Sequence, residues 1–484
     1  MSDALYVLDG ASSWATPSRI LNLSRWRRHL LESNVGFQAT TIPEDLRLPA
    51  RVDVVVIGGG IVGISTAMAL AEKGVSVAVC EKGVIAGEQS GRNWGWCRTA
   101  HRDLRELPLS IESLRMWRTM GPKLGMDTGF RQSGILYVAA DAHALAKHER
   151  WLSQARALLG NDALKSRMTS AAETASLMPG VSRSAAGGMA GGMYTPADGQ
   201  AEPERAVPAM ALALRARGVR ILMPCAVRGI ETNAGETSGV MTEHGRIRCT
   251  SVVIAGGAWT RLFSASLGIE MPQLAVRASV LCTAPVAGGP EVSACYRTVG
   301  YRKRLDGGYI VAHASRSVAE LTPDSFRLFS QYWPVLKTQL GSMDFALGRR
   351  FIDALRQPRS WPLDQPTLFE TERMLAPKPV QAHNDIALRD FRALFPKLGP
   401  VKIARSWAGY IDVTPDAVPV ISAAGKIRGL FISAGYSGHG FGLGPAAGRL
   451  TADLVVNDQP IVDPHAFRLG RFSDGSRVEL GEGF

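Results

Sequence analysis

The sequence predicts an α/β protein in which a parallel sheet, built from distant segments, is joined to a second domain based on an antiparallel sheet. Three observations predict this class. A β-branched run, Val52–Ile57, is followed by glycines and a helical pattern. Two further apolar runs, Ser251–Ala255 and Leu430–Ala434, come much later in the chain. Short uninterrupted apolar runs are typical of parallel strands that are buried on both faces.

The first run opens a βαβ unit. Three glycines, Gly58–Gly60, follow the strand, a helical pattern extends over Ile61–Lys73, and Gly74 ends it. The next strand is Val75–Cys80. A strand, a tight glycine turn, a helix and a second strand within about thirty residues form the arrangement of a parallel crossover.

The chain then makes an excursion before it returns to this sheet. Ile135–Ala139 is a predicted strand, and a helix is expected over Asp141–Leu159. The following segments are a glycine-rich connection at 187–192, a helix over 204–217, strands at 218–222 and 226–232, and a hairpin at 240–250. The parallel sheet is therefore expected to be discontinuous in sequence.

Residues beyond the excursion alternate short strands with an insertion. Tyr309–His313 is a predicted strand, and two helices are expected within Pro323–Arg356. A proline-rich irregular stretch follows over 357–379, and the last helix is expected to begin at Gly444.

These elements divide the chain between two domains and their extensions. The nucleotide-binding, Rossmann-like domain is expected to comprise 51–125, 188–270 and 401–465. The substrate domain is expected to comprise 126–187 and 271–400, with a helical insertion over 321–379. An N-terminal extension over 1–50, with a short helix at 24–33, and a C-terminal tail over 466–484 complete the division.

Composition and charge exclude several classes of protein. With 46% hydrophobic and 20% charged residues among 484, the chain has the composition of a globular protein. The net charge is +12, but no run of five Lys or Arg occurs, so no nucleic-acid partner is expected. We expect no secretory signal and no membrane-spanning helix. The six cysteines form no CxxC pair, which predicts free thiols and no metal site.

The glycines after the first strand have the spacing of a dinucleotide-binding turn. Gly58 permits a tight turn, Gly60 lets the backbone approach a pyrophosphate, and Gly63 lets the helix pack on the strand. Glu81 ends the second strand, where its carboxylate is placed to accept hydrogen bonds from ribose hydroxyls. We therefore predict a dinucleotide site; a glycine turn in an ordinary parallel sheet is the alternative.

Two further glycine-rich segments are candidates to contact the rest of a dinucleotide. Residues 86–96 combine Ser and Asn with Trp94 and Trp96, and offer many backbone N–H groups to a flavin ring. Residues 435–444 precede the last helix, whose positive N-terminal end suits the negative charge of a reduced flavin. Together these segments favour FAD as the cofactor.

The motifs occur in the order found in a known family. The runs VVVIGGGIVGISTAMALAEKG, EKG, SGRN, VVIAGGAWT and GYSGHGFGLGPAAG resemble the D-amino-acid oxidase superfamily of FAD-dependent oxidoreductases, which includes glycine oxidase and sarcosine oxidase. Within it the chain is most similar to the bacterial membrane-associated L-amino acid deaminases, through EKGVIAGEQSGR, CAVRGIET, QPRSWPLDQPTLFE, GPAAGRLTADLV and IVDPHAF. It departs from those deaminases at 93–98.

The resemblance implies which residues contact FAD. The expected cofactor-binding residues are Gly58, Gly60, Ile61, Val62, Gly63, Glu81, Lys82, Gln89, Ser90, Gly91, Arg92, Asn93, Trp94, Gly95, Val227, Ala255, Gly256, Gly257, Trp259, Gly409, Gly435, Ser437, Gly438, His439, Gly440, Phe441 and Gly442.

The resemblance also implies an arginine for the substrate carboxylate, in a strand of the form DGxYxVAxR. Here the arginine of the corresponding run, Arg316, lies two residues later, and a shift of two along a strand preserves the face. Arg316 is therefore the leading catalytic candidate, because a planar guanidinium suits a carboxylate, and Arg302 and His313 are alternatives. Candidate wall residues, each of which would otherwise serve in packing, are Tyr410, Gln89, Trp94, Trp96 and His439.

The expected reaction is oxidation of a small amino acid or amine. Hydride would pass from the α-carbon to flavin N5, and the imino acid would be hydrolysed to a keto acid and ammonia. Oxygen or a quinone would be the electron acceptor, and orientation and electrostatics would carry the catalysis. Four alternatives stay open: the flavin subunit of a hetero-oligomeric opine or hydroxyproline-type dehydrogenase, an oxidase of an N-methyl or cyclic amino acid, an RNA-modification protein, and an NAD-dependent dehydrogenase.

The insertion carries a candidate membrane contact. Within 325–360, Phe326, Phe329 and Trp333 alternate with basic side chains, a pattern that suits an anionic lipid surface. Packing of the same apolar residues on the substrate domain is the alternative. We expect a cytoplasmic protein with a peripheral contact on the inner face of the membrane.

Overall fold

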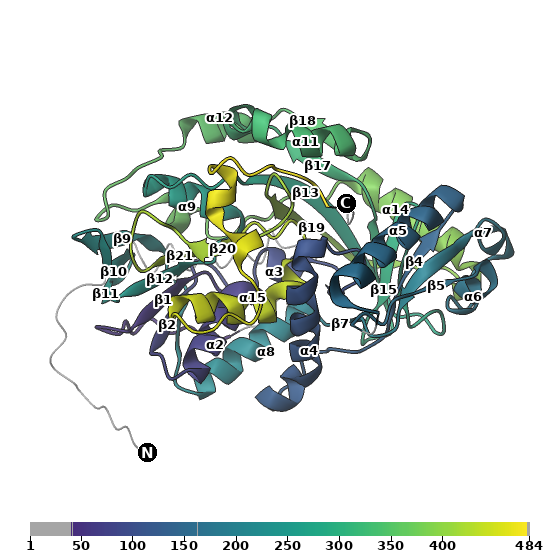
Figure 1. Ribbon diagram of the computed structural model, residues 1–484, viewed down its shortest axis with the longest axis horizontal. Helices are drawn as coiled ribbons and strands as arrows, with labels where there is room; N and C mark the ends of the chain where they lie inside the picture. Colours follow the sequence, from purple (N-terminus) through teal and green to yellow (C-terminus); the bar gives the residue numbers. More distant parts are fainter. Residues whose placement is uncertain (1–39, 41, 162, 482–484) are drawn as a thin grey trace, which may run out of the picture.

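Two large sheets organise the molecule, which is known here from a computed structural model that describes residues 40, 42–161 and 163–481. A six-stranded sheet and a ten-stranded sheet lie side by side along the long axis, and a thin layer of helices covers them on one side (Figure 1). The helix expected over 24–33 lies outside the described residues.

The six-stranded sheet is assembled from distant segments, as predicted. Its order is β20-β21-β12-β1-β2-β8, with every neighbouring pair parallel except β20 and β21. The strands are β1 (Val54–Ile57), β2 (Val77–Cys80), β8 (Arg220–Leu222), β12 (Ser251–Ile254), β20 (Val420–Ala423) and β21 (Leu430–Ala434).

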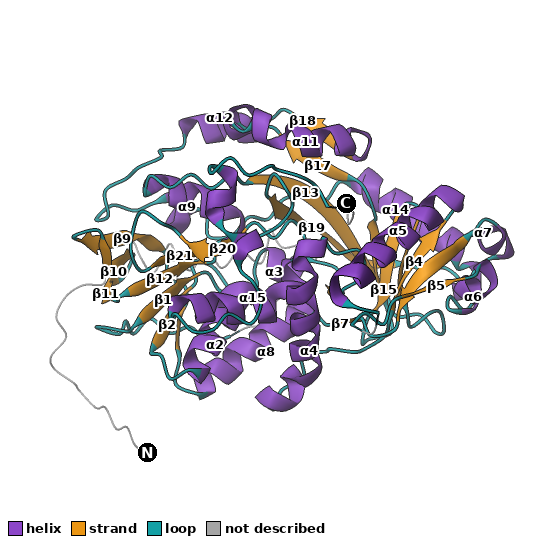
Figure 2. Ribbon diagram, in the orientation of Figure 1, coloured by secondary structure: helices purple, strands orange, loops and turns teal. Residues whose placement is uncertain are grey.

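Both faces of this sheet are covered, which explains its uninterrupted apolar strands. Val54 and Val56 pack into a core on the helical side, whereas Val55 packs into a second core on the other side. The helices on the first side, visible together in Figure 2, are α2 (Ile61–Glu72), α4 (Leu107–Leu124), α8 (Pro203–Ala216) and α15 (Gly440–Val455). The strands of the small sheet on the second side are β9 (Val227–Asn233), β10 (Glu236–Thr242) and β11 (Gly245–Arg248).

Helices α2 and α15 pack with almost no space between their backbones. A Cβ atom added at Gly444 would lie 2.3 Å from Ile61 Cγ1, and one at Gly448 would lie 2.4 Å from Ser65 Cβ. The glycines of α15 are therefore required by helix packing as well as by the turn that precedes the helix.

The predicted start of α15 was wrong by one turn, because the helix begins at Gly440 and not at Gly444. Pro445 suits the first turn of a helix, yet it lies inside α15. Neighbouring α4 supports the extra turn: Ser113 Oγ and Trp117 Nε1 donate hydrogen bonds of 2.6 and 3.0 Å to the carbonyl of Gly442. A tertiary contact thus extended the helix beyond its local signal.

The ten-stranded sheet is mainly antiparallel, which confirms the predicted class of the second domain. Its order is β18-β17-β13-β16-β15-β14-β4-β6-β5, and β19 pairs with β13. Only the pairs β4·β14 and β17·β18 are parallel. The strands are β4 (Ile135–Ala139), β5 (Arg167–Thr169), β6 (Gly191–Thr195), β13 (Leu274–Thr283), β14 (Ser293–Tyr296), β15 (Val299–Lys303), β16 (Tyr309–His313), β17 (Ser317–Glu320), β18 (Met343–Ala346) and β19 (Ile403–Val413).

Several elements differ from the sequence-based expectation. The connection expected at 187–192 already contains the start of β6, and the unpredicted α14 (Gln381–Leu394) packs Phe391 against Tyr301 and Tyr309. Further elements are α3 (Gln89–Arg92), β3 (Trp96–Cys97), α5 (Ala142–Leu159), α6 (Ala171–Ser176), α7 (Arg183–Gly187), β7 (Gly199–Gln200) and α9 (Thr260–Ser266).

The insertion contains α10 (Pro323–Arg327), α11 (Phe329–Gln339), β18, α12 (Arg349–Arg356) and α13 (Leu368–Thr371). Three of these helices lie within Pro323–Arg356, so the expectation of two helices there was wrong. The first part of the insertion, with α11, β18 and α12, forms the layer at the top of Figure 1. Strand β18 was missed because it forms only by pairing with β17 at the edge of the large sheet. No helix among the described residues is both long and apolar enough to span a bilayer.

Candidate active site

A cavity of about 1640 Å³ lies between the two sheets. It runs from Glu81 and Val227, past the carboxyl end of β1, to Tyr137 on the large sheet, and the insertion lines its outer part. Ligands of open parallel sheets bind outside the carboxyl ends of the strands, so the cavity lies where a dinucleotide is expected. Of the predicted cofactor residues, all line this cavity except Gly63, Gly91, Gly435 and Gly442.

The glycine turn has no room for side chains. Gly58 has a φ of +115°, and a Cβ atom there would lie 2.4 Å from the carbonyl oxygen of Ala255. A Cβ at Gly63 would lie 2.0 Å from the carbonyl oxygen of Gly58, and one at Gly60 would lie 2.9 Å from Ser90 Oγ. The turn therefore forms a close-fitting cradle at the N-terminus of α2, which suits a pyrophosphate.

Glu81 lies beside this cradle at the end of β2. Its carboxylate accepts hydrogen bonds from the backbone N–H groups of Gly59 and Gly83, at 2.7 and 2.6 Å. Burial raises its pKa, and Lys82 and the two N–H groups oppose that shift. The two backbone bonds fix the carboxylate at the edge of the cavity; its contact with ribose stays a prediction.

The segment after β2 forms the wall between the cradle and the large sheet. Ser90 Oγ accepts a hydrogen bond of 2.9 Å from the N–H of Ile61, which joins this segment to the start of α2. Arg92 is buried and donates to the carbonyls of Gly87 and Ala408, at 2.9 and 3.1 Å. Arg92 therefore bridges the two domains beside the cavity.

A buried carboxylate that was missed from the sequence organises the loop before α15. Asp412 accepts hydrogen bonds from the N–H of Gly435 at 2.8 Å and from Gln273 Nε2 at 2.9 Å. Its backbone carbonyl accepts from the N–H of Ser437. Burial raises the pKa of Asp412 to about 6. Its position in an alternating strand, β19, was the only signal in the sequence.

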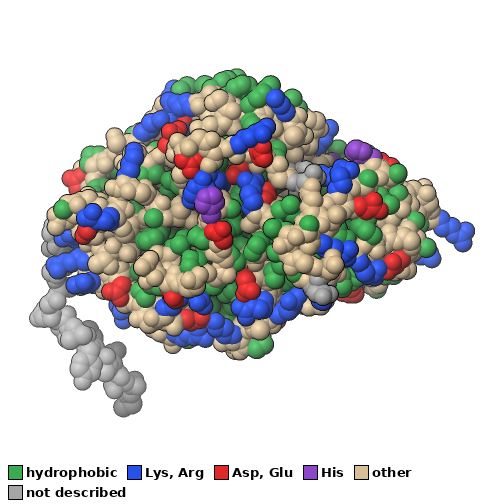
Figure 3. Space-filling view, in the orientation of Figure 1, with side chains coloured by type: hydrophobic (Ala, Val, Ile, Leu, Met, Phe, Trp, Pro, Cys, Tyr) green, Lys and Arg blue, Asp and Glu red, His purple; other side chains and the backbone are tan. Residues whose placement is uncertain are grey.

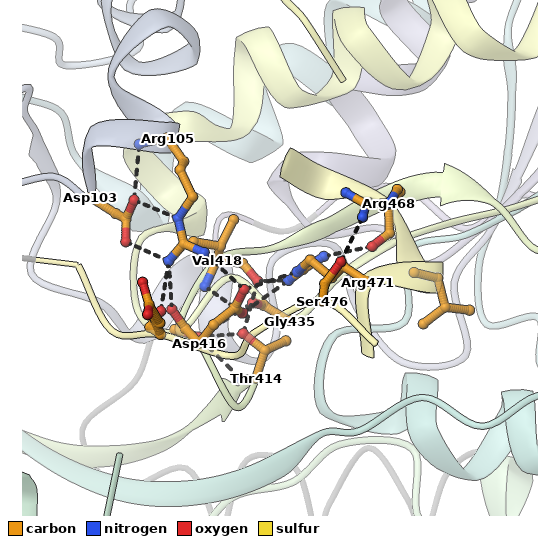
Figure 4. A network of polar contacts seen from close by, with 12 residues as sticks. Asp103, Arg105, Thr414, Asp416, Val418, Gly435, Arg468, Arg471 and Ser476 are labelled. Atoms are coloured by element: carbon orange, nitrogen blue, oxygen red, sulfur yellow. Dashed lines mark hydrogen bonds and ion pairs between the residues drawn. The ribbon is translucent and has the colours of Figure 1, made fainter. Parts of the chain in front are cut away.

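The C-terminal segment clamps the turn after β19 (Figure 4). Arg471 and Asp416 form a buried pair with nitrogen–oxygen distances of 2.9 and 3.0 Å. Arg105 also reaches Asp416, at 3.2 Å, and is held by Asp103. The turn from Thr414 to Asp416 is therefore held by the segment that contains Asp103 and Arg105 and by the C-terminal segment.

His439, one residue before α15, faces a buried carboxyl group. His439 Nδ1 lies 2.8 Å from Glu106 Oε2. Burial raises the pKa of Glu106 to about 8, and burial together with the charges of Arg102 and Arg98 lowers the pKa of His439 well below its usual value. At neutral pH both groups are therefore uncharged.

The predicted substrate arginine is placed differently from the expected strand position. Strand β16 ends at His313, and Arg316 lies in the connection to β17, so the inference from strand alternation was wrong. Arg316 lines the cavity but is exposed, and its Nη1 lies 3.3 Å from Asp344. His313 also lines the cavity, and its Nδ1 accepts from the N–H of Arg316 at 3.1 Å.

The remaining candidates have well-defined partners. Arg302 is 1% exposed and makes a two-pronged pair with Glu202, at 2.9 and 2.8 Å, so its guanidinium serves the structure. Tyr410 lines the cavity and donates to Glu320 at 2.6 Å, with the Arg350 guanidinium 3.9 Å above its ring. Gln89, which begins α3, also lines the cavity.

A group of polar residues at the inner end of the cavity was also missed. It consists of Arg98, His101, Arg102, Tyr137 and His148, and all five line the cavity. The sequence signal was the run of basic residues that follows Trp96. Strand β4 and helix α5 complete this cluster from a distant part of the chain.

Comparison with known proteins decides the family. The model of the DAO family, FAD dependent oxidoreductase, matches residues 53–454. The chain belongs to this family. Its cofactor is therefore FAD, as predicted, and the close-fitting glycine cradle and the long cavity suit that cofactor. The NAD-dependent alternative is set aside.

Solved structures share this fold over most of the chain. The L-amino acid deaminase from Proteus myxofaciens, in complex with anthranilate, is 33% identical, with a TM-score of 0.86 over 90% of this chain and 97% of that chain. The L-amino acid deaminase from Proteus vulgaris is 32% identical, with a TM-score of 0.84 over 90% of this chain and 100% of that chain.

Relatives identified by sequence are more distant. The mitochondrial sarcosine dehydrogenase of Mus musculus is 26% identical over 92% of this chain and 44% of its own length. The chain thus spans about half the length of that relative. Sarcosine oxidase subunit beta from Arthrobacter sp is 24% identical over 88% of this chain and 92% of its own length. The family match places the chain among FAD-dependent oxidoreductases.

Proposed function

We propose that this protein catalyses the oxidative deamination of a free α-amino acid. One observation carries the proposal: a single cavity joins the FAD cradle to the cationic and aromatic side chains of the large sheet. The similarity to the Proteus deaminases supports the same reaction. The deaminase from Proteus vulgaris matches with a TM-score of 0.84 when intact and of 0.71 when its specific insertion sequence is deleted.

The residues that line the cavity suit a reaction in which the protein mainly positions the substrate against the flavin. FAD, when bound, supplies the hydride acceptor for the α-carbon. Arginine side chains on the cavity wall bind the carboxylate, and Arg316 stays a predicted ligand for it. Trp94 and Trp96 pack edge to face, with ring centroids 5.3 Å apart, and exclude water beside the expected flavin position. No strong base is required when the amine binds in its neutral form.

The test is a panel of amino acids of both configurations, mixed with the purified flavoprotein without oxygen. A substrate should bleach the flavin absorbance, and a keto acid and ammonia should accumulate on turnover. Oxidation of N-methyl or cyclic amines alone would instead support the secondary-amine alternative. The similarity to a sarcosine oxidase subunit keeps the hetero-oligomeric dehydrogenase as a second candidate, which predicts a co-purifying polypeptide.

We also propose that the insertion contacts an anionic membrane surface; oxygen and a quinone both stay candidates for the electron acceptor. Phe326, Leu347 and Leu355 are 63%, 70% and 60% exposed, so these side chains do not pack on the substrate domain. Hydrophobic and basic side chains gather along the upper edge of the molecule in Figure 3. An amphipathic basic surface of this kind suits anionic lipid.

Flotation with anionic and neutral vesicles tests the contact. The double variant Phe326→Ser and Leu347→Ser should lose binding to anionic vesicles, while its flavin content stays normal. Binding of the variant at the level of the original protein would refute the contact. Turnover with a soluble quinone, compared with peroxide formation in oxygen, tests the acceptor.

A further inference from the structure

Two arginines at the inner end of the cavity have no carboxylate partner. Arg98 and Arg102 both line the cavity, and neither forms an ion pair within the described part of the chain. Arg102 is 2% exposed, and its Nη1 has no hydrogen-bond partner among the described residues. Burying a guanidinium without an anionic partner costs free energy, so we infer that a negatively charged ligand binds beside these residues.

The charge of one buried carboxylate, Asp198, acts on both arginines without a described ion pair to either, and a single carboxylate does not balance two guanidinium groups. Asp198 accepts from the N–H and Oγ1 of Thr99, both at 2.8 Å, and from the N–H of Ala100 at 3.1 Å. Glu106 is uncharged at neutral pH, because burial raises its pKa to about 8. Arg102 stays protonated there, although burial and the charge of Arg98 lower its pKa to about 9. The inner end is therefore electropositive.

Further unpaired polar atoms and aromatic rings lie around the two arginines. Trp96 Nε1 and His148 Nε2 are buried, and neither has a hydrogen-bond partner in the described structure. The Trp96 and Tyr137 rings pack edge to face at 6.0 Å, and the Arg98 guanidinium lies 5.7 Å from the centre of the Tyr137 ring. The other nitrogen of the His148 ring lies 2.7 Å from His101 Nε2. These side chains line a pocket that has a polar part and an aromatic part.

This pocket lies beside the start of α15. A Cβ atom at Gly442 would be 3.4 Å from Arg102 Nη2, and the charges of Arg102 and Arg98 both act on His439. Arg316, in contrast, is exposed, is paired with Asp344, and precedes β17 on the far side of the sheet from β4. The unpaired positive charge is thus at the inner end of the cavity, near the loop expected to contact the flavin.

We propose that Arg98 and Arg102 bind the carboxylate of the substrate, with Trp96 Nε1 as a further donor. The inference deepens the proposed function and rests on it. The two guanidinium groups supply charge-assisted hydrogen bonds to the carboxylate oxygens, and the aromatic wall excludes water from them. The substrates are then amino acids whose carboxylate is free, and amides and esters of the same amino acids bind poorly.

The test measures binding of carboxylates that lack an amine, so no turnover takes place. The probes are 3-phenylpropanoate and hexanoate, with 3-phenylpropanamide and hexanamide as neutral counterparts, titrated into the FAD-loaded protein while the flavin absorbance is recorded. We expect at least one carboxylate to bind roughly tenfold or more tightly than its amide. Carboxylates that bind no better than their amides would overturn the proposal.

Variants of the two arginines test whether they form the carboxylate site. Arg98→Gln and Arg102→Gln should each weaken carboxylate binding by roughly 10- to 100-fold without changing amide binding, and Arg102→Lys should recover part of the loss. Arg115→Gln, on the exposed face of α4, is the matched control. If Arg102→Gln fails to retain FAD, the half-buried Arg98 decides the outcome. Carboxylate binding at the original affinity in a variant with normal FAD content refutes the proposal.

The two proposals fail in different ways. If the unmodified protein oxidises amino acids while the Arg98 and Arg102 variants keep their carboxylate affinity and KM, only the carboxylate site is wrong. If the protein oxidises no amino acid, the proposed function is wrong, and the probe titration still decides whether the pocket binds anions.

Discussion

The FAD cradle and the insertion are built under opposite constraints. Around the cradle, Val55 and Val56 are fully buried, and any side chain at Gly58 or Gly63 would meet backbone atoms. In the insertion, Phe326 and Leu347 are 63% and 70% exposed. Interior packing dictates the residues of the first region, whereas the exposed apolar residues of the second are the ones that the proposed membrane contact would cover. Substitutions should therefore act on stability and FAD binding in the first region and on association in the second.

The largest expected effect comes from the clamp on the turn after β19. Arg471→Met removes one member of a buried ion pair and leaves the Asp416 carboxylate with Arg105, at 3.2 Å, as its remaining cationic partner among the described residues. We expect a loss of about 3–5 kcal/mol in the free energy of unfolding. Chemical denaturation of the FAD-loaded protein measures it.

Arg477→Met is the control, because Arg477 pairs with Glu479 at an exposed site. It should cost less than about 1 kcal/mol. Equal effects of the two substitutions would show that the clamp contributes nothing beyond a surface pair.

A smaller loss of stability, with a complete loss of function, is expected at the glycine turn. In Gly58→Ala the new Cβ would lie 2.4 Å from the Ala255 carbonyl, at a φ of +115° that side chains rarely adopt. We expect destabilisation by about 2–3 kcal/mol and a protein without flavin. The ratio of flavin to protein absorbance measures the second effect.

Gly187→Ala serves as the comparison, because no atom lies within 4 Å of a Cβ at that position in α7. This variant should retain its full flavin content. A flavin-replete Gly58→Ala protein would contradict the tight fit inferred for the cradle.

At Glu106 we expect a moderate effect on the free energy of unfolding that depends on pH. Its pKa is about 8 in the folded protein and 4.5 when unperturbed, so the folded chain holds a proton that the unfolded chain releases between these values. The stability of the unmodified protein should therefore fall as pH rises through this window. Glu106→Gln does not titrate, and its stability relative to the unmodified protein should rise by about 1 kcal/mol or more from pH 5 to pH 8.

Thermal unfolding at several pH values measures this difference. Glu112→Gln, on the exposed side of α4, should show no such trend. A constant difference between Glu106→Gln and the unmodified protein would mean that the carboxyl group is already ionised in the fold.

The smallest effect on stability is expected in the insertion. Leu355 is 60% exposed, so Leu355→Ser should change the free energy of unfolding by less than about 0.5 kcal/mol. The buried Leu388 of α14 is the matched site, where the same substitution should cost roughly 2–5 kcal/mol. Comparable losses at the two sites would mean that α12 packs against the protein and that the insertion needs no external partner.

Local patterns were sufficient for much of the fold. The strands β4, β16 and β21 begin and end where the sequence predicts, because apolar β-branched runs bounded by turn residues specify a buried strand locally. The glycine turn, its acidic partner Glu81 and the FAD cofactor were predicted for a related reason. Gly63 meets Gly58 within one βαβ unit, so the spacing of the motif is visible in the sequence, although Gly58 and Gly60 also meet Ala255 and Ser90 from outside that unit.

The remainder depended on contacts between distant segments. Strand β18 exists through its pairing with β17, and the first turn of α15 is supported by Ser113 and Trp117 of α4. The sequence likewise says nothing about the partners of a candidate arginine. Arg302 forms an ion pair with Glu202 and Arg316 with Asp344, whereas Arg98 and Arg102 form no ion pair with a carboxylate within the described structure.

The sequence alone therefore determined the dinucleotide fold, the cofactor and the class of enzyme, because these rest on short motifs whose spacing is set by backbone geometry. Only the tertiary structure decided which charged side chains are neutralised and which face the cavity. Charge pairing and burial are set by three-dimensional neighbours, and those neighbours come from parts of the chain that no local pattern connects.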